Sequence, residues 1–227
     1  MESGAFTRSL VPVYNSDGSL ALDTEQYPRP ATTAEQLGQL KPAFEAQMDM
    51  AFADSGMTFR EWVNRTWPDL EVDHRHHAGS SSGIVDGAAA LVLASSEYAR
   101  SNELKPRARV RAMANMGHSP EYILNGPVDA ANKVLKKAGM NLDDIDLFEV
   151  NEAFAVVPMK FMRDLNIDHD KLNVNGGAIA LGHPLGMSGA RILGSAALEL
   201  QLQNKRYALV TMCIGVGQGF AVILERA

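Results

Sequence analysis

The chain contains a single cysteine, Cys213, among its 227 residues. No disulfide can form within it, and scarce cysteine favours a reducing compartment, so we expect the protein in the cytoplasm. No apolar run reaches the roughly 18 residues of a membrane-spanning helix. Residues 1–10 also lack the basic and then apolar order of a signal peptide. The sequence therefore predicts no membrane partner.

Runs of basic residues are also missing. The formal net charge is −6, and lysine and arginine are spread along the chain without a cluster. Proteins that bind nucleic acid carry a basic face, so we expect no nucleic-acid partner. Apolar residues make up 46% and charged residues 21%, which is typical of a globular chain with one large or two small domains.

The second half of the sequence alternates between strand and helix patterns. Strands are predicted at residues 105–117, 145–150, 173–175, 207–213 and 220–226, and helices at 128–139, 151–165 and 188–202. This alternation is typical of a layered α/β core. Before it, the apolar residues 88–94 predict a fully buried strand, followed by a helix from Ser96.

The first 50 residues are polar, rich in turns and weakly periodic. Residues 9–13 favour a strand. A helix is expected to open at Thr32 or Thr33, with Gln36 completing a capping box at Thr33. We expect this region to cover a neighbouring core and not to form one of its own.

Residues 46–77 hold both tryptophans and three closely spaced histidines. A helix is expected over residues 58–66, and aromatic side chains on one of its faces indicate packing more often than a ligand site. His74, His76 and His77 suggest a metal site. Alternate positions along a loop, with no carboxylate or cysteine to complete the set, are poor geometry for one ion, so we expect no metal.

Three turns at the ends of predicted strands each carry a reactive group. These groups are Asn151, His183 within the glycine-rich stretch 173–191, and Cys213. Functional sites of α/β proteins gather where strands end, so the three are expected to meet. Each also has a purely structural interpretation. Asn151 can cap a helix, His183 can lie exposed in a stiff turn, and a lone cysteine is usually a small buried hydrophobe.

The turn after Cys213 reads CIGVGQG, with glycine at positions 215, 217 and 219. Alternating glycines leave backbone N–H groups free to point at an oxygen that becomes negative during a reaction. A thiol beside such donors can act as a nucleophile or as an acid and base, depending on its pKa. The residues alone leave both roles open.

Three motifs together resemble the thiolase family closely: NEAFA at 151–155, NVNGGAIALGHPLGMSGAR at 173–191 and CIGVGQG at 213–219. The segments ESGAF (2–6), PRP (28–30), LKPAF (40–44) and SSSGIVDGAAA (80–90) match upstream landmarks of the family. The resemblance implies the layered αβαβα thiolase fold. Residues 1–77 would form part of the covering loop domain, 78–102 the last piece of the N-terminal core, and 103–227 a complete C-terminal domain.

The resemblance also implies an activity. Thiolases use CoA to cleave a 3-oxoacyl-CoA to acetyl-CoA and a shortened acyl-CoA, as in fatty-acid β-oxidation, or run the reverse condensation. By motif, His183 would deprotonate the nucleophilic thiol, and Cys213 would exchange a proton with the α-carbon of the acetyl unit. Asn151 would hold a water in one oxyanion hole, and the Gly215 N–H would line the other.

Coenzyme A enters this chemistry as a substrate, and no separate cofactor is implied. Ser82, Ala153 and Phe154 fall where the family contacts the pantetheine arm of CoA. Ser82 also has an interpretation as an ordinary turn residue. Full-length members are commonly homo-oligomers, so acyl-CoA, CoA and further copies of the chain are the implied partners.

One departure from the family bears on activity. The acylated cysteine of thiolases lies in their N-terminal half, and Cys213 matches the second, acid–base cysteine. We therefore expect the chain to represent the C-terminal part of a thiolase and to be inactive alone. A split enzyme with a separate N-terminal half, or a non-catalytic CoA-binding remnant, are the alternatives. The aromatic residues of 45–77, a segment longer than usual, suggest a bulky or long acyl group.

Overall fold

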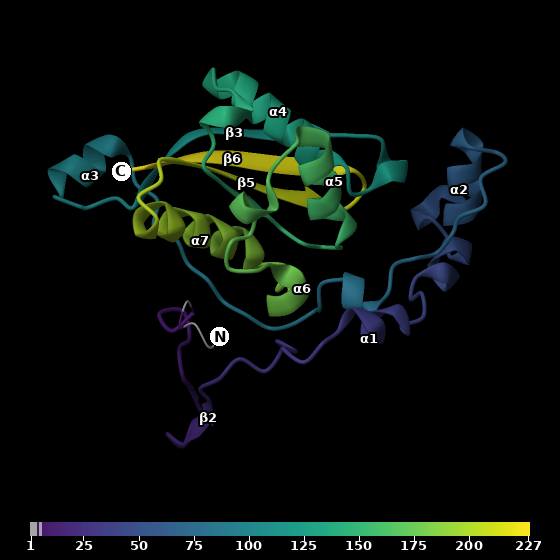
Figure 1. Cartoon of the computed structure of the whole chain (residues 1–227), viewed down its shortest axis with the longest axis horizontal. Coiled ribbons are helices and arrows are strands. Elements are labelled where there is room, and N and C mark those ends of the chain that lie inside the picture. Colours follow the sequence, from purple (N-terminus) through teal and green to yellow (C-terminus); the bar gives the residue numbers. More distant parts are fainter. Residues whose placement is uncertain (1–3, 5) are drawn as a thin grey trace.

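The computed structural model describes residue 4 and residues 6–227. Glu2, Ser3 and Ala5 of the predicted landmark at 2–6 lie outside the described residues. The second half of the chain folds into a layered body, while much of the first half runs around it as extended segments and short helices (Figure 1). The α/β class predicted from the sequence is confirmed.

A four-stranded sheet forms the middle layer of the body, with the strand order β3-β6-β5-β4. Its strands are β3 (Ala108–Gly117), β4 (Leu147–Val150), β5 (Tyr207–Ile214) and β6 (Gln218–Arg226). β5 pairs with β4 in parallel and with β6 antiparallel, and β3 pairs antiparallel with β6. Because β4 and β5 are parallel, their carboxyl ends meet at one edge of the sheet.

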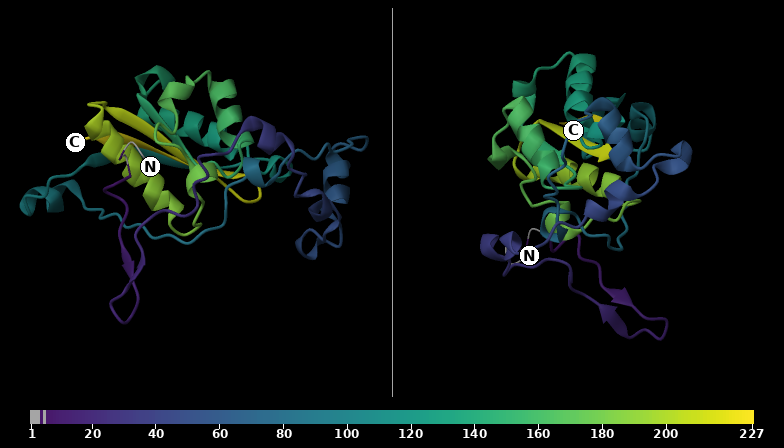
Figure 2. Two further views of the ribbon diagram at one scale, coloured as in Figure 1. Left: turned by 60° about the horizontal axis from the view of Figure 1, so that its bottom comes forward. Right: turned by 90° about the vertical axis from the view of Figure 1, so that its right-hand side faces the viewer.

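Helices cover both faces of this sheet. α4 (Gly126–Ala138) and α5 (Val156–Leu165) pack into one apolar cluster with the sheet, and α7 (Ser188–Leu202) packs into a second cluster. Figure 2 shows the sheet between these layers. The three predicted helices are thus confirmed, and Gly139 ends α4 in the left-handed conformation that glycine adopts readily.

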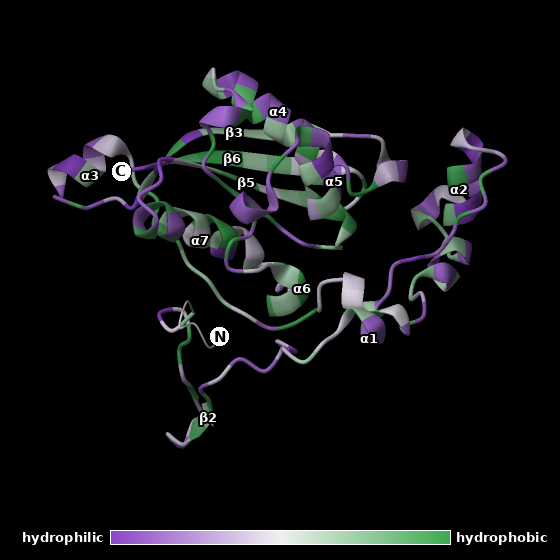
Figure 3. Cartoon of the chain, viewed as in Figure 1, coloured by the Kyte–Doolittle hydropathy of each residue, from purple (hydrophilic) through white to green (hydrophobic). Residues whose placement is uncertain are grey.

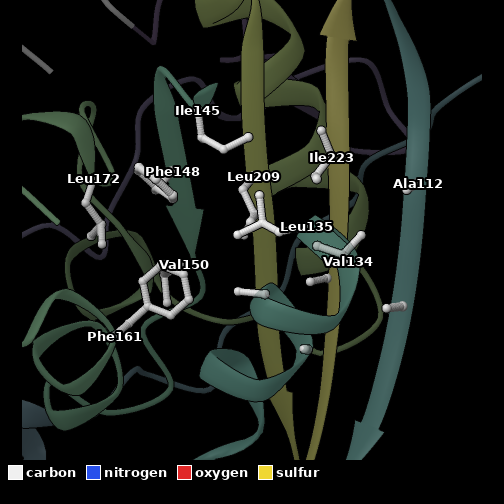
Figure 4. Close-up of a cluster of buried hydrophobic side chains, with 14 of the residues drawn as sticks. Ala112, Val134, Leu135, Ile145, Phe148, Val150, Phe161, Leu172, Leu209 and Ile223 are labelled. Atoms are coloured by element: carbon white, nitrogen blue, oxygen red, sulfur yellow. The ribbon is translucent and has the colours of Figure 1, made fainter. Parts of the chain in front are cut away.

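The larger cluster lies between α4, α5 and the sheet (Figure 4). Val134 and Leu135 project from α4 toward Leu209 of β5 and Ile223 of β6, while Phe161 of α5 is fully buried. A buried aliphatic or aromatic side chain of this size stabilises a fold by about 1.5–3 kcal/mol. Many such side chains hold β4 and β5 rigidly, and these strands carry the candidate site.

Close backbone contact joins α4 to the turn between β5 and β6. A Cβ atom on Gly219 would lie 2.2 Å from the backbone of Gly126, and one on Gly126 would lie 2.3 Å from the carbonyl oxygen of Gln218. Only glycine fits at these two positions. Gly219 therefore also serves the close packing of β6 against α4.

The first half of the chain contains only short elements. A small hairpin of β1 (Val13–Tyr14) and β2 (Leu20–Leu22) projects from the body (Figure 2), so the predicted strand at 9–13 is largely wrong. α1 (Ala34–Gly38) carries the predicted capping box at Thr33, and α2 (Phe59–Thr66) has another at Thr58. Short 3₁₀ turns occupy Glu45–Asp49, Ala53–Ser55, Ala78–Ser80, Pro120–Tyr122, Leu142–Asp144 and His169–Lys171.

The buried strand predicted at residues 88–94 is wrong. These residues run as an extended segment outside the sheets of the described chain and lead into α3 (Ser96–Ser101). Val92 is 94% exposed and Leu93 is 81% exposed. Figure 3 shows apolar colour along this segment where it passes α6 and α7. The apolar pattern predicts burial, but the described residues supply no neighbouring strand for it.

The strand predicted at residues 173–175 is also wrong. Only an isolated parallel bridge between Phe148 and Leu172 remains of it, and Asn173 has a positive φ of 47°. The chain then turns into α6 (Ala178–Leu181), a one-turn helix that the sequence pattern did not reveal. This irregular path carries the glycine-rich stretch over the end of β4.

Candidate functional site

Asn151 lies at the carboxyl end of β4 and is almost fully buried, with 1% of its surface exposed. Its backbone N–H donates to the carbonyl oxygen of Thr211 on β5 at 3.0 Å. The parallel pairing of β4 and β5 therefore fixes the position of Asn151. Asn151 does not cap a helix by a side-chain bond, because α5 begins only at Val156 and its N-cap residue is Ala155.

Glu152 fastens the glycine-rich stretch to the end of β4. Its Oε1 accepts from the Asn173 side chain at 2.8 Å, and its Oε2 accepts from the backbone N–H of Ile179 in α6 at 3.1 Å. Gly177 makes this possible, since a Cβ there would lie 2.1 Å from the Glu152 carboxyl carbon. A carboxylate at the N-terminal turn of α6 is also favoured by the peptide dipoles.

The same anchoring brings His183 onto Asn151. Asn151 Nδ2 lies 3.3 Å from His183 Nε2, so the two predicted residues are in hydrogen-bond contact. The other ring nitrogen, Nδ1, lies 2.6 Å from the hydroxyl of Ser188, the first residue of α7. The His183 backbone N–H donates to the carbonyl oxygen of Gly83 at 2.8 Å. His183 is therefore held from three sides and is not a loosely exposed turn residue.

Burial lowers the pKa of His183, and the nearby positive charge of Arg191 lowers it further. Both effects disfavour the imidazolium form, because it would carry a charge into a partly dry site beside another cation. The ring is therefore neutral at pH 7. A neutral imidazole can accept a proton.

Cys213 lies near the end of β5, beyond Thr211, whose carbonyl oxygen binds Asn151. Burial raises the pKa of the Cys213 thiol to about 11, so the sulfur is protonated at neutral pH. A thiol in this state is a poor nucleophile, because the thiolate is the attacking form. Its environment suits a group that holds a proton and can deliver it.

The turn that follows Cys213 exposes backbone donors. Within the described part of the chain, the Gly215 N–H has no hydrogen-bond acceptor. Gly217 adopts a φ of +77°, and its carbonyl oxygen accepts from the His118 N–H at 2.7 Å, which fixes the turn. An N–H held without a partner at a rigid turn is suited to bind a developing oxyanion.

Ser82, Ala153 and Phe154 also meet. The Ser82 N–H and hydroxyl both donate to the Ala153 carbonyl oxygen, at 3.0 Å and 3.2 Å, and Ser81 pairs with Phe154 in an isolated antiparallel bridge. The Phe154 ring packs against Phe44 and against His76, with ring centroids 5.4 Å and 4.9 Å apart. The three residues expected to contact pantetheine thus lie together, and Gly83, next to Ser82, binds the His183 N–H.

Sequence reasoning missed the supporting residues of the site. These residues are Ser188, Asn173 and Glu152. The available signal was their position in the motifs, Glu152 in 151–155 and Asn173 and Ser188 in 173–191. Which nitrogen, oxygen or helix each one meets depends on the tertiary fold.

A second buried polar group lies beside the site. Glu149 on β4 is 7% exposed, and burial raises its pKa to about 8, against the opposing effect of the Arg191 charge. Burial lowers the pKa of Arg191. Of the two groups, Arg191 is the one whose charge acts on His183, and it lowers the pKa of that imidazole.

Neither a metal cluster nor a membrane helix is found in the part of the chain that the structure describes. No group of three histidine, cysteine or acidic side chains there could hold an ion, so His74, His76 and His77 form no such site. No helix among the described residues is long and apolar enough to cross a bilayer.

The fold and the site define an α/β protein with a histidine, an asparagine and a protonated thiol at the carboxyl edge of its sheet. Comparison with known proteins shows which family has this fold. The family model described as "Thiolase, C-terminal domain" matches residues 104–226. The chain belongs to the thiolase family.

Curated relatives and solved structures agree with this placement. The 3-oxoadipyl-CoA/3-oxo-5,6-dehydrosuberyl-CoA thiolase of Escherichia coli K12 is 44% identical, over 99% of this chain and 51% of its own length. The acetyl-CoA acetyltransferase of the same strain is 41% identical, over 100% and 51%.

Among solved structures, the acetyl-CoA acetyltransferase of Bacillus anthracis matches all of this chain and 51% of its own, with a TM-score of 0.81 and 34% identity. Human mitochondrial 3-ketoacyl-CoA thiolase matches with a TM-score of 0.79 and 35% identity, over 100% of this chain and 51% of its own. The chain therefore spans about half the length of the relatives it matches.

Proposed function

We propose that this chain supplies the acid–base side of a thiolase reaction, the cleavage of a 3-oxoacyl-CoA by CoA or the reverse condensation. The observation that carries the proposal is the 3.3 Å contact between Asn151 Nδ2 and His183 Nε2, with Cys213 on the adjoining strand. Relatives that align over the whole chain are named thiolases and acetyl-CoA acetyltransferases. Fatty-acid β-oxidation is one source of such substrates.

Each group has a role that fits its protonation state. Neutral His183 accepts the proton of the thiol that attacks the 3-oxo carbon. When the carbon–carbon bond breaks, Cys213 donates its proton to the acetyl-CoA carbanion. Asn151, through a water, and the Gly215 N–H stabilise the negative oxygens that develop on the two substrates. All four roles remain those that the thiolase motifs imply.

The acyl-CoA enters along Ser82, Ala153 and Phe154. These residues present a backbone edge and an aromatic ring beside the His183 loop, which suits a chain such as pantetheine that has both amide and apolar parts. One of the solved relatives was crystallised in complex with CoA, human mitochondrial 3-ketoacyl-CoA thiolase. The aromatic segment 45–77 lies beyond Phe154 and is proposed to select a bulky or long acyl group.

The attacking thiol must come from outside residues 1–227, because Cys213 is their only cysteine. We assign residues 1–77 to the covering loop domain, 78–102 to the end of an N-terminal core and 103–227 to the C-terminal domain. The exposed apolar segment 88–94 then pairs with the N-terminal core that carries the thiol. Thiolase activity arises in that combination, and further copies of the assembly form a homo-oligomer.

A hybrid enzyme tests this function. The part of E. coli 3-oxoadipyl-CoA thiolase that precedes the matched region is joined upstream of this chain, and thiolysis of acetoacetyl-CoA is measured. We expect the hybrid to be active and the chain alone to be inactive. His183→Asn should lower kcat by about 10²–10⁴-fold, whereas the matched control His169→Asn, at an exposed position, should not. A folded hybrid without activity, or an active His183→Asn hybrid, would contradict the proposal.

A second candidate is CoA binding without catalysis. The observation in its favour is that Ser82 and Ala153 are joined by hydrogen bonds within the described residues, whereas residues 1–227 contain no cysteine besides Cys213. Calorimetry with CoA distinguishes the two. CoA binding by the chain together with a folded but inactive hybrid supports this second candidate, and an active hybrid excludes it.

A further inference from the structure

The side chain of Ser188 completes a chain of polar contacts that starts at the His183 ring. Ser188 is fully buried, and its hydroxyl oxygen lies 2.6 Å from His183 Nδ1 and donates to the Pro184 carbonyl oxygen at 3.0 Å. On the opposite side of the ring, Nε2 faces Asn151 Nδ2 at 3.3 Å. Both ring nitrogens therefore have a partner supplied by this chain.

Two proton arrangements are compatible with these positions. In the first, Nδ1–H donates to Ser188, the Ser188 hydroxyl donates to Pro184, and Asn151 donates to the lone pair of Nε2. In the second, the Ser188 hydroxyl donates to Nδ1, and Nε2–H donates to Asn151, whose amide group is turned round. A serine hydroxyl has only one proton, so it cannot serve Nδ1 and Pro184 together.

The first arrangement makes three hydrogen bonds and the second makes two. Turning the Asn151 amide adds no hydrogen bond. In the first arrangement its Oδ1 lacks a partner, and in the second its Nδ2 lacks one instead. Pro184 accepts in addition from the backbone N–H groups of Met187 and Ser188, so its carbonyl oxygen stays satisfied and the comparison depends on the Ser188 hydroxyl alone. The extra bond favours the tautomer with the proton on Nδ1.

We propose that Ser188 is a positioning residue that fixes His183 as the Nδ1–H tautomer and keeps the Nε2 lone pair directed toward Asn151. Ser188 is the first residue of α7, which is packed on the sheet, so the hydroxyl is held on a rigid element. A hydrogen bond to one nitrogen sets the state of the other in the same way at metal-bound and triad histidines.

The proposed function enters only in the consequence of this tautomer, because a base that accepts a proton at Nε2 must carry no proton there. The tautomer itself is a property of the chain. It is measurable without a thiol nucleophile, a substrate or any activity, so its failure and that of the proposed function are separate outcomes.

Long-range ¹H–¹⁵N NMR spectra of the uniformly ¹⁵N-labelled full chain, recorded at neutral pH, report which ring nitrogen carries the proton. His183→Asn identifies the His183 signals by their loss. In the unmodified chain we expect Nδ1 protonated and Nε2 unprotonated. A wild-type His183 with the proton on Nε2 overturns the proposal, whatever any variant does.

Ser188→Ala removes the hydroxyl and should lower the ratio of Nδ1–H to Nε2–H about tenfold, the ratio that one net hydrogen bond sustains. Thr211→Val is the matched control, because Thr211 is also fully buried and its hydroxyl donates to a carbonyl oxygen, that of Phe220, at 2.7 Å. This control should leave the tautomer unchanged. A folded Ser188→Ala chain with the wild-type ratio, or an equal change in Thr211→Val, overturns the proposal.

Discussion

At the scale of single residues, burial moves the two titrating groups of the site in opposite directions. It lowers the pKa of the His183 imidazole and raises the pKa of the Cys213 thiol. Both groups are consequently neutral at pH 7, one as a free base and the other as a free acid. This separation supports the proposed roles, in which the histidine accepts a proton and the cysteine donates one.

The pH dependence of Cys213 follows from its environment. Its pKa rises from the ordinary 9.0 to about 11 in the fold because burial disfavours the thiolate. The neutral thiol thus contributes stability that is fully present below pH 9 and is lost as the pH rises toward 11. We expect the rate of alkylation by iodoacetamide to reach half its maximum near pH 11 in the folded chain.

Urea-unfolded chain is the control for this titration. The pKa of its single thiol should lie near the ordinary value of 9.0. A folded chain that reacts with the same pH profile as the unfolded one would show that Cys213 is not desolvated, and would remove the argument for its acid role.

At the scale of elements, the site depends on how α6 and the glycine-rich stretch lie against the end of β4. Glu152 joins these parts through Asn173 and Ile179, and Gly177 leaves room for its carboxylate. The stretch has little regular structure, so these few contacts determine where His183 lies. Gly177 thus allows the glycine-rich stretch to approach Glu152 closely, because glycine has no side chain.

Gly177→Ala tests this contact. The added methyl group would overlap the Glu152 carboxylate, and we expect a loss of about 1–3 kcal/mol in the free energy of unfolding measured with urea. Gly186→Ala is the matched control in the same stretch, because a Cβ there has no atom within 4 Å. Equal stability of the two variants would show that the Glu152 contact does not hold the stretch.

The elements also show what the sequence can and cannot predict. Strands β3, β5 and β6 and helices α4 and α7 follow from apolar periodicity, and Gly139 and Thr33 follow from local capping chemistry. The path at 173–175 does not, because Asn173 is held by distant Glu152 and Val150 and not by its neighbours. Pattern predicts elements, whereas long-range side-chain contacts decide the irregular segments between them.

At the scale of the whole molecule, the layered body is well packed while residues 84–93 leave large apolar side chains in water. Ile84 is 92% exposed and Val92 is 94% exposed. The failed prediction of a buried strand here has a physical reason, since a sequence pattern reports the burial that a segment favours and not whether its neighbours are present. An exposed apolar edge of this kind promotes self-association.

Replacing Val92 and Leu93 by lysine tests this reading. The double variant should associate less with itself in sedimentation velocity, while its free energy of unfolding stays within about 0.5 kcal/mol of the original, since neither side chain is packed. Val11→Lys is the control, an exposed apolar position in the first half of the chain. Unchanged self-association of the double variant would mean that this apolar segment does not cause the association.

The central claim is that Cys213 is the acid of the site and not its nucleophile. Intact-mass spectrometry of the hybrid enzyme after mixing with acetoacetyl-CoA, followed by peptide mapping, locates the acyl group directly. We predict an acetyl adduct on the cysteine of the added N-terminal half and none on Cys213, in the hybrid or in the chain alone. An acyl group mapped to Cys213 would contradict the account.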